Sequence, residues 1–238
     1  MRKLIVFLWL LIGLLLLADR GAAYVAGNQT ARQVRIHEGL REDPKVTFRG
    51  FPFVTQAADN RFDRVDVTVR DYERGGIRID RIDATLRGVE VSVSKALHGR
   101  LDTVAADSGT ATVHVRYADL GEYLRAKPGN IRLTVRAGQV FVTSTFGVPN
   151  VGTVEVEGAP TVTVTDTAVR VVVKTVHVVS GSARLTGALA ATAAARASFE
   201  VPLRGLPFGI KAVSAALTDT ALVVQATAVG LVIDVGSG

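Results

Sequence analysis

Apolar and polar residues alternate through much of the chain after residue 60, and this pattern restricts the fold more than any other feature. Val65, Val67 and Val69 are separated by polar residues, and the same alternation recurs in Ala111–Arg116. Successive side chains of a β-strand point to opposite faces, so each stretch predicts a strand with one buried face. Turn residues such as Gly75-Gly76 separate the stretches, which predicts antiparallel strands joined in sequence order.

The pattern continues to the end of the chain with two helical stretches interrupting it, and a third helical stretch precedes it. Strands are expected at residues 65–70, 77–86, 89–94, 111–116, 131–136, 139–145, 152–157, 161–166, 168–179, 199–203, 210–217, 222–229 and 231–235. Helices are expected at residues 21–40, 117–124 and 185–196, where apolar residues recur every three or four positions. The predicted fold class is α+β and β-dominated: a long curved antiparallel sheet wrapping one or two helices, preceded by an N-terminal membrane segment.

The N-terminus has the features of an export signal or a membrane anchor. Arg2-Lys3 precede Leu4–Ala18, a run without charge that ends at Asp19-Arg20. As a helix the run covers about 22 Å, less than the ~30 Å hydrocarbon core, which fits a signal peptide. It fits an anchor equally if the helix continues, and we favour the anchor because Gly21–Ala23 is a poor cleavage site. Basic residues ahead of the run place the N-terminus in the cytoplasm and the remainder outside.

Residues 1–20 are therefore expected to be a signal peptide or signal anchor, and residues 21–238 a single ectodomain, since no linker rich in Pro, Gly or Ser divides them. The formal net charge is +6 and the charges are interspersed. This favours an anionic membrane surface and does not indicate a nucleic-acid groove. The chain has no Cys, which excludes disulfides and thiolate metal sites.

No catalytic or metal-binding pattern withstands scrutiny, so we expect no enzyme activity, cofactor or metal. The four His are scattered, and the pairs Asp63/Asp66 and Asp80/Asp83 enclose arginines, which indicates a charge-balanced sheet face. Ser92 and Lys95 match Ser-x-x-Lys, but alternating strand sequence would point them to opposite faces. No Gly-rich loop follows a strand into a helix in a phosphate-binding pattern.

A Gly-x-Pro-Phe corner occurs twice, first in Arg49–Phe53 and again in Arg204–Phe208. Gly permits turn dihedrals and Pro fixes φ and removes a ladder donor, so each copy predicts a chain reversal at the start of a strand. Each copy also has large apolar side chains, which a turn does not require.

The corners and their flanks resemble one family. GFPFVTQ followed by RFDRVDV, and the later GLPFGIKAVSAALTDTALVVQATA, are similar to the LmeA-like phospholipid-binding family of actinobacterial envelope proteins. The resemblance implies binding of phospholipid, phosphatidylinositol-type or another anionic lipid, in the cell envelope. It also implies a role in the maturation of mannosylated, lipomannan-type lipids.

Large apolar residues gather at the corners and strand ends, where ordinary packing is one explanation. The other is a hydrophobic groove between small-residue strands and a helix, able to hold an acyl chain. The lipid-binding candidates are Phe51, Phe53, Phe62, Phe141, Phe146, Leu206 and Phe208. Arg49 and Arg204 flank the corners and are the candidates for a phosphate headgroup, because guanidinium forks match its oxygens.

Two functions remain open from the sequence. The first is a non-catalytic phospholipid-binding protein at the outer face of the membrane. The second is an interaction module whose apolar corners dock on a membrane glycosyltransferase without taking up lipid.

Overall fold

The fold is described from a computed structural model in which the chain divides into two compact units. The structure describes residues 2–97, 103–125, 130–148, 152–165, 168–181, 187–203 and 211–234. The first unit comprises Met1–Asp71, Ile82–Ala111 and Ala228–Gly238, and the second comprises Tyr72–Arg81 and Thr112–Thr227. The predicted class is confirmed: antiparallel strands dominate, helices are few, and an apolar helix precedes them.

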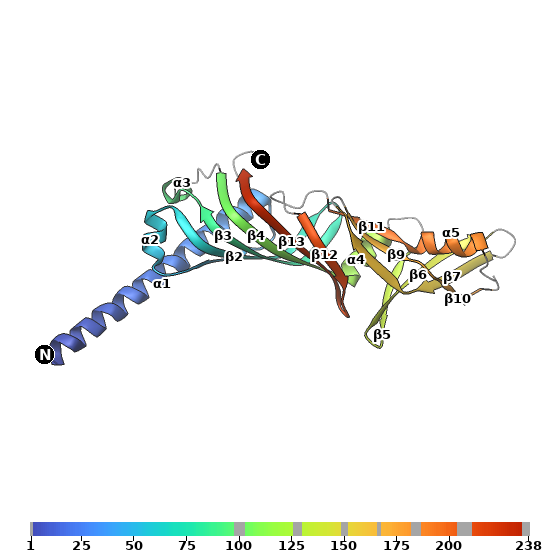
Figure 1. Ribbon diagram of the computed structural model, residues 1–238, viewed down its shortest axis with the longest axis horizontal. Coiled ribbons are helices and arrows are strands. Elements are labelled where there is room, and N and C mark those ends of the chain that lie inside the picture. The colour runs from blue at the N-terminus through green and yellow to red at the C-terminus, as the bar shows by residue number, and fades with distance from the viewer. Residues whose placement is uncertain are drawn as a thin grey trace. The chain divides into compact units, whose positions relative to one another are not determined.

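The N-terminal helix α1 (Arg2–Glu38) is one uninterrupted element of 37 residues (Figure 1). It therefore joins the apolar run to the helix expected at residues 21–40. Its apolar side chains are exposed along Trp9–Leu17, with Trp9 at 70% and Leu17 at 73%. By length and composition the helix can cross a membrane.

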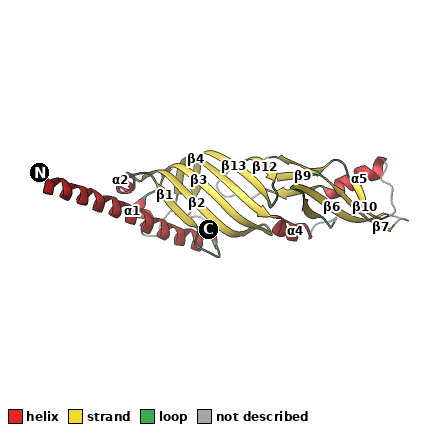
Figure 2. Ribbon diagram, turned by 90° about the horizontal axis from the view of Figure 1, so that it is seen from below, coloured by secondary structure: helices red, strands yellow, loops and turns green. Residues whose placement is uncertain are grey.

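The second half of α1 packs on the edge strand β1 (Lys45–Arg49) (Figure 2). Ala23, Gly27 and Ala31 are buried at four-residue spacing, which places them on one face of the helix. A Cβ on Gly27 would lie 2.6 Å from the carbonyl oxygen of Val46. The two backbones are therefore in direct contact, and only glycine fits between them.

After β1 the chain turns through the first corner into α2 (Phe53–Ala58) and then β2 (Arg61–Arg74). The prediction that the corner leads directly into a strand is wrong, because α2 lies between the corner and β2. β1 and β2 pair antiparallel, with Phe48 opposite Val65 and Arg49 opposite Arg64. The apolar residues of both strands consequently share one face and the polar residues the other.

A six-stranded sheet has the order β1-β2-β3-β4-β13-β12. Its remaining strands are β3 (Ile77–Glu90), β4 (Thr103–Arg116), β12 (Lys211–Leu217) and β13 (Ala221–Asp234). The two strands expected at 222–229 and 231–235 form the single strand β13, in which Gly230 has a positive φ of 63°. The strand expected at 89–94 ends at Glu90, and α3 (Val93–Leu97) replaces its second half.

The second unit contains two smaller sheets and two helices, α4 (Tyr117–Arg125) and α5 (Gly187–Ala197), both predicted. One sheet has the order β10-β7-β6-β5 and the other β11-β9-β8. Their strands are β5 (Arg132–Arg136), β6 (Gln139–Val148), β7 (Gly152–Gly158), β8 (Pro160–Val164), β9 (Ala168–Val173), β10 (His177–Ser180) and β11 (Phe199–Pro202).

The strand expected at 168–179 is divided between these sheets. β9 pairs with β8 and β11, whereas β10 pairs with β7. A Cβ on Gly158 would lie 2.3 Å from the carbonyl oxygen of Thr175, so the chain passes from one sheet to the other directly over a glycine. Helix α5 contacts β6, β7 and β9, and its Ala193 packs in a cluster with Phe146 and Val154.

Gly27 provides a test of the contact between α1 and β1. We expect Gly27→Ala to lower the melting temperature of the full chain in detergent micelles, because overpacking against backbone costs about 1–3 kcal/mol. Gly21 is the matched control, since a Cβ there meets nothing within 4 Å. Gly21→Ala should be neutral or stabilising by up to ~1 kcal/mol through helix propensity. Equal effects of the two substitutions in a thermal melt followed by circular dichroism would contradict the contact.

Candidate functional site

The corner between β1 and α2 is built around Gly50, which has a φ of +100°. A Cβ at this position would lie 2.5 Å from Nε2 of Gln56 and 2.8 Å from Oδ2 of Asp63. A side chain is thus excluded both by the backbone conformation and by the neighbouring atoms. Gly50 allows β1 to end beside the start of β2.

Gln56 connects the corner to β2 through two side-chain hydrogen bonds. Its Nε2 donates to the carbonyl oxygen of Pro52 at 3.3 Å, and its Oε1 accepts from the backbone N–H of Asp63 at 2.8 Å. The side chain is 9% exposed, so both hydrogen bonds are largely shielded from water. Gln56 thereby helps to hold the short helix α2 at its start and against β2.

Three phenylalanines pack together under the corner. The ring centroid of Phe48 lies 4.7 Å from that of Phe62 and 5.6 Å from that of Phe53, and the Phe53–Phe62 distance is 5.7 Å. Phe53 is 8% exposed and Phe62 only 2%, whereas Phe51 at the turn is 54% exposed. The structure therefore brings Phe53 and Phe62 together in a buried cluster and leaves Phe51 pointing outward.

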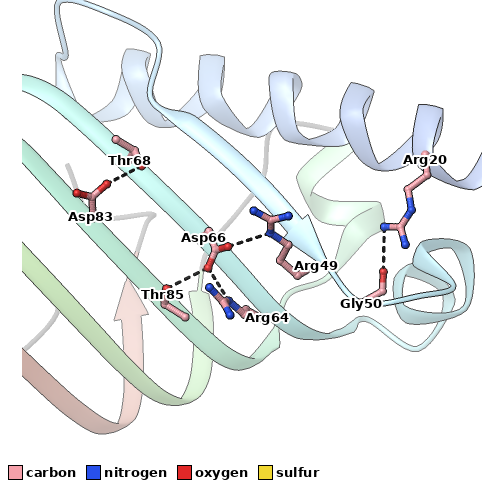
Figure 3. Close-up of polar contacts among 8 residues, drawn as sticks. All are labelled: Arg20, Arg49, Gly50, Arg64, Asp66, Thr68, Asp83 and Thr85. Atoms are coloured by element: carbon pink, nitrogen blue, oxygen red, sulfur yellow. Dashed lines mark hydrogen bonds and ion pairs between the residues drawn. The ribbon is translucent and has the colours of Figure 1, made fainter.

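Helix α1 contacts the same corner where its apolar run ends. Oδ1 of Asp19 accepts a hydrogen bond from the backbone N–H of Val54 at 3.0 Å, near the start of α2. Asp19 is 5% exposed, and its buried Oδ2 has no hydrogen-bond partner among the described residues. Arg20 donates to the carbonyl oxygen of Gly50 at 3.2 Å (Figure 3). Its guanidinium lies 5.6 Å from the ring centroid of Phe51.

A polar cluster lies on the neighbouring sheet face and centres on Asp66 (Figure 3). Nε of Arg49 donates to Oδ2 of Asp66 at 3.0 Å, and Nε of Arg64 donates to Oδ1 at 2.7 Å. The hydroxyl of Thr85 adds a third hydrogen bond at 3.0 Å. Partial burial opposes ionisation, but the bonds from Arg64, Arg49 and Thr85 outweigh it and hold the pKa of Asp66 below its ordinary value.

The other predicted lipid-binding residues lie elsewhere or outside the described residues. Phe141 and Phe146 both belong to β6 in the second unit. The guanidinium of Arg136 lies 4.6 Å from the ring centroid of Phe141, and that of Arg196 lies 5.3 Å from the ring centroid of Phe146. Arg204, Leu206 and Phe208 of the second corner lie outside the described residues.

Comparison with known proteins identifies the family. A family model described as LmeA-like phospholipid-binding matches residues 17–227. The chain belongs to the LmeA-like phospholipid-binding family. Neither curated proteins nor solved structures gave a significant match. Membership of the LmeA-like family supports a lipid-binding role, and the matched region includes Asp19, Arg20 and the first corner.

The Ser-x-x-Lys match in this LmeA-like chain, a pattern found in some hydrolases, lies at the start of a helix. The backbone N–H of Lys95 donates to Oγ of Ser92 at 3.4 Å, at the start of α3. The prediction that Ser92 and Lys95 lie on opposite faces of a strand is wrong, because the chain is helical from Val93. The Ser92 hydroxyl acts as a helix N-cap.

Three of the paired aspartates, Asp66, Asp80 and Asp83, have polar partners in the sheet. Asp66 is bound by two arginines, and Asp83 accepts a hydrogen bond from the hydroxyl of Thr68 at 2.9 Å. Asp80 lies 3.3 Å from Nε of Arg116. Within the described residues, no three potential metal ligands come together.

Three residues that contact or flank the corner, Asp19, Phe48 and Gln56, were not singled out from the sequence of this LmeA-like protein. Phe48 had a usable signal, since it alternates with Val46 and immediately precedes the first corner. Gln56 and Asp19 had none, because their hydrogen bonds depend on how β2 and α1 lie beside α2. Asp19 was interpreted only as the boundary of the membrane segment.

Asp66 gives a pH-dependent prediction for the polar cluster. Since its folded pKa lies below the ordinary value of 3.8, its ionised form stabilises the folded state above that pH. This contribution is lost as the pH falls through the lowered pKa. We expect Asp66→Asn to reduce the free energy of unfolding at neutral pH and to differ progressively less from wild type below about pH 4.

Urea titrations of the full chain in micelles between pH 3 and 7 measure this difference. Asp107→Asn is the control for removing an exposed carboxylate that pairs with an arginine, since Asp107 is 63% exposed beside Arg61. A pH-independent effect of Asp66→Asn would contradict the assignment.

Proposed function

We propose that this LmeA-like protein is a non-catalytic phospholipid-binding protein anchored in the cell envelope. The observation that supports it most is the family match over residues 17–227, in a chain whose N-terminal helix is apolar and exposed. The lipid is of the phosphatidylinositol type or another anionic phospholipid. The resemblance to envelope proteins further leads us to propose a role in maturation of lipomannan-type lipids.

The apolar side of strands β2 and β3 is our proposed acyl-chain surface. Thr68 binds Asp83 and Thr85 binds Asp66, so these four side chains share the polar side (Figure 3). The alternate residues then lie on the opposite side, and among them Val65, opposite Phe48, is 5% exposed.

Beyond the phenylalanine cluster the same apolar side is less well covered. Val67, Val69, Ala84 and Leu86 all remain partly exposed. An acyl chain lying on this surface would bury them, and each methylene removed from water contributes about 0.8 kcal/mol. Phe53 and Phe62 would form the packed end of such a groove, with Phe51 at its outer rim.

The headgroup is proposed to interact with Arg49. Arg49 and Arg64 share one carboxylate, so the cluster has one positive charge in excess. Arg49 is the last residue of β1 and its side chain is 60% exposed. Because Arg49 lies on the polar side, a headgroup would reach it around the strand end rather than through the sheet.

We further propose that α1 is retained as an anchor with the rest of the chain on the outer face of the cytoplasmic membrane. The basic residues Arg2 and Lys3 precede the apolar run, which favours a cytoplasmic N-terminus. The helix is continuous through Gly21–Ala23. Cleavage there would remove the contacts of Asp19 and Arg20 with the corner.

Photocrosslinking tests lipid uptake. The full chain is reconstituted with an anionic phospholipid that has a diazirine near the end of one acyl chain, and labelled peptides are identified by mass spectrometry. We expect labels in β2 and β3, because the proposed groove lies there. Labels confined to α1 and the corner would mean that the protein contacts only bilayer lipid. That result favours the alternative function, an interaction module that docks on a glycosyltransferase without taking up lipid.

A matched pair of substitutions makes this test specific. Val69→Asp places a charge on the proposed acyl-chain surface and should abolish labelling of β2 and β3. Val229→Asp makes the same change on β13, where the valine is already 88% exposed, and should leave labelling unchanged. Equal labelling of the two variants would contradict the groove.

The headgroup assignment is tested by lipid selectivity. We expect Arg49→Gln to reduce the preference for anionic over zwitterionic photolipid about tenfold or more, since a charge-assisted hydrogen bond contributes about 1.5–3 kcal/mol. Arg170→Gln is the control, because Arg170 is also an exposed arginine paired with a carboxylate, that of Glu200. An unchanged preference in Arg49→Gln would overturn the assignment.

A further inference from the structure

The apolar run of α1 is too short to cross a bilayer by itself. Leu4–Ala18 covers about 22 Å as a helix, which leaves about 8 Å of a ~30 Å hydrocarbon core unfilled. With Arg2 and Lys3 at the inner interface, the outer boundary of the hydrocarbon falls about five residues beyond Ala18, near Ala23. Asp19 and Arg20 lie inside that boundary.

Both charged residues form hydrogen bonds with the corner. Asp19 is 5% exposed, and its Oδ1 accepts the backbone N–H of Val54. Arg20 donates to the carbonyl oxygen of Gly50 and lies over the ring of Phe51. A charge at the membrane boundary is costly unless it is hydrogen-bonded and shielded, and the corner gives each residue a hydrogen bond and buries Asp19.

The same contacts fix the position of the corner along the axis of α1. Phe51 and Val54 are in direct contact with Arg20 and Asp19, yet their side chains are 54% and 57% exposed. On the adjoining turns of α1, Tyr24 and Val25 are also more than half exposed. Exposed apolar side chains from two separate segments therefore lie near the end of the apolar run.

We propose that Phe51 and Val54 insert into the outer leaflet of the bilayer that α1 crosses. The corner thereby completes the membrane-contacting surface where the apolar run Leu4–Ala18 alone is too short, and it shields Asp19 from lipid. This insertion into the bilayer is separate from binding of a lipid to the sheet. It requires only α1, α2 and the turn between β1 and α2.

Tryptophan fluorescence with brominated lipid tests the insertion. The full chain has one tryptophan, so Phe51→Trp and Val54→Trp are each made in a Trp9→Phe background. The variants are reconstituted in phosphatidylcholine vesicles with or without bromine near the glycerol end of the acyl chains. We expect about twofold quenching of both, since interfacial apolar groups lie ~5–10 Å within the headgroup and acyl boundary.

Ile36→Trp in the same background is the matched negative control. Ile36 is 70% exposed on α1 but about 24 Å beyond Arg20 along the helix. Native Trp9 in the unaltered chain is the positive control for reconstitution. Quenching of Phe51→Trp and Val54→Trp no greater than that of Ile36→Trp, with Trp9 quenched, would overturn the proposal. The side chains of Phe51 and Val54 are more than half exposed, so we expect their replacement by tryptophan to leave the packing of the corner unchanged.

Discussion

The close contact between α1 and β1 is the interaction on which the first unit depends. Gly27 lets the helix backbone approach the carbonyl oxygen of Val46, and Ala23 and Ala31 extend this contact along the helix. Once the helix is held there, Asp19 reaches the start of α2. The position of the corner relative to the apolar run therefore follows from small residues on one helix face.

The corner in turn holds together three elements that follow one another along the chain, β1, α2 and β2. Gly50 and Gln56 join the end of β1 to the start of β2, while Phe53 and Phe62 pack against Phe48. These contacts leave the polar cluster around Asp66 on one side of the sheet and the partly exposed valines on the other. One rigid turn thus fixes both surfaces that we assign to the lipid.

Local patterns were sufficient for much of the fold. Alternation predicted the strands because the period of two follows from backbone geometry alone, and three- and four-residue spacing predicted α4 and α5. The short helix α2 was missed because its start is held by a residue from α1, which no local pattern records. The division of β9 from β10 depends on Gly158 of another strand. The phenylalanines at positions 51, 53 and 62 were noted from the sequence as lipid-binding candidates, and only the structure shows that Phe53 and Phe62 pack together.

Helix α1 is both a packing partner of β1 and the proposed membrane anchor, so folding of the first unit depends on the same helix as the proposed anchoring. β1 is the last strand of its sheet on one side, and a bare strand edge is a template for pairing with other chains. In this protein α1 packs on that strand. A copy that lost its first 38 residues would expose both an unpaired edge and a row of small apolar contacts. Self-association through β1 would then compete with correct folding.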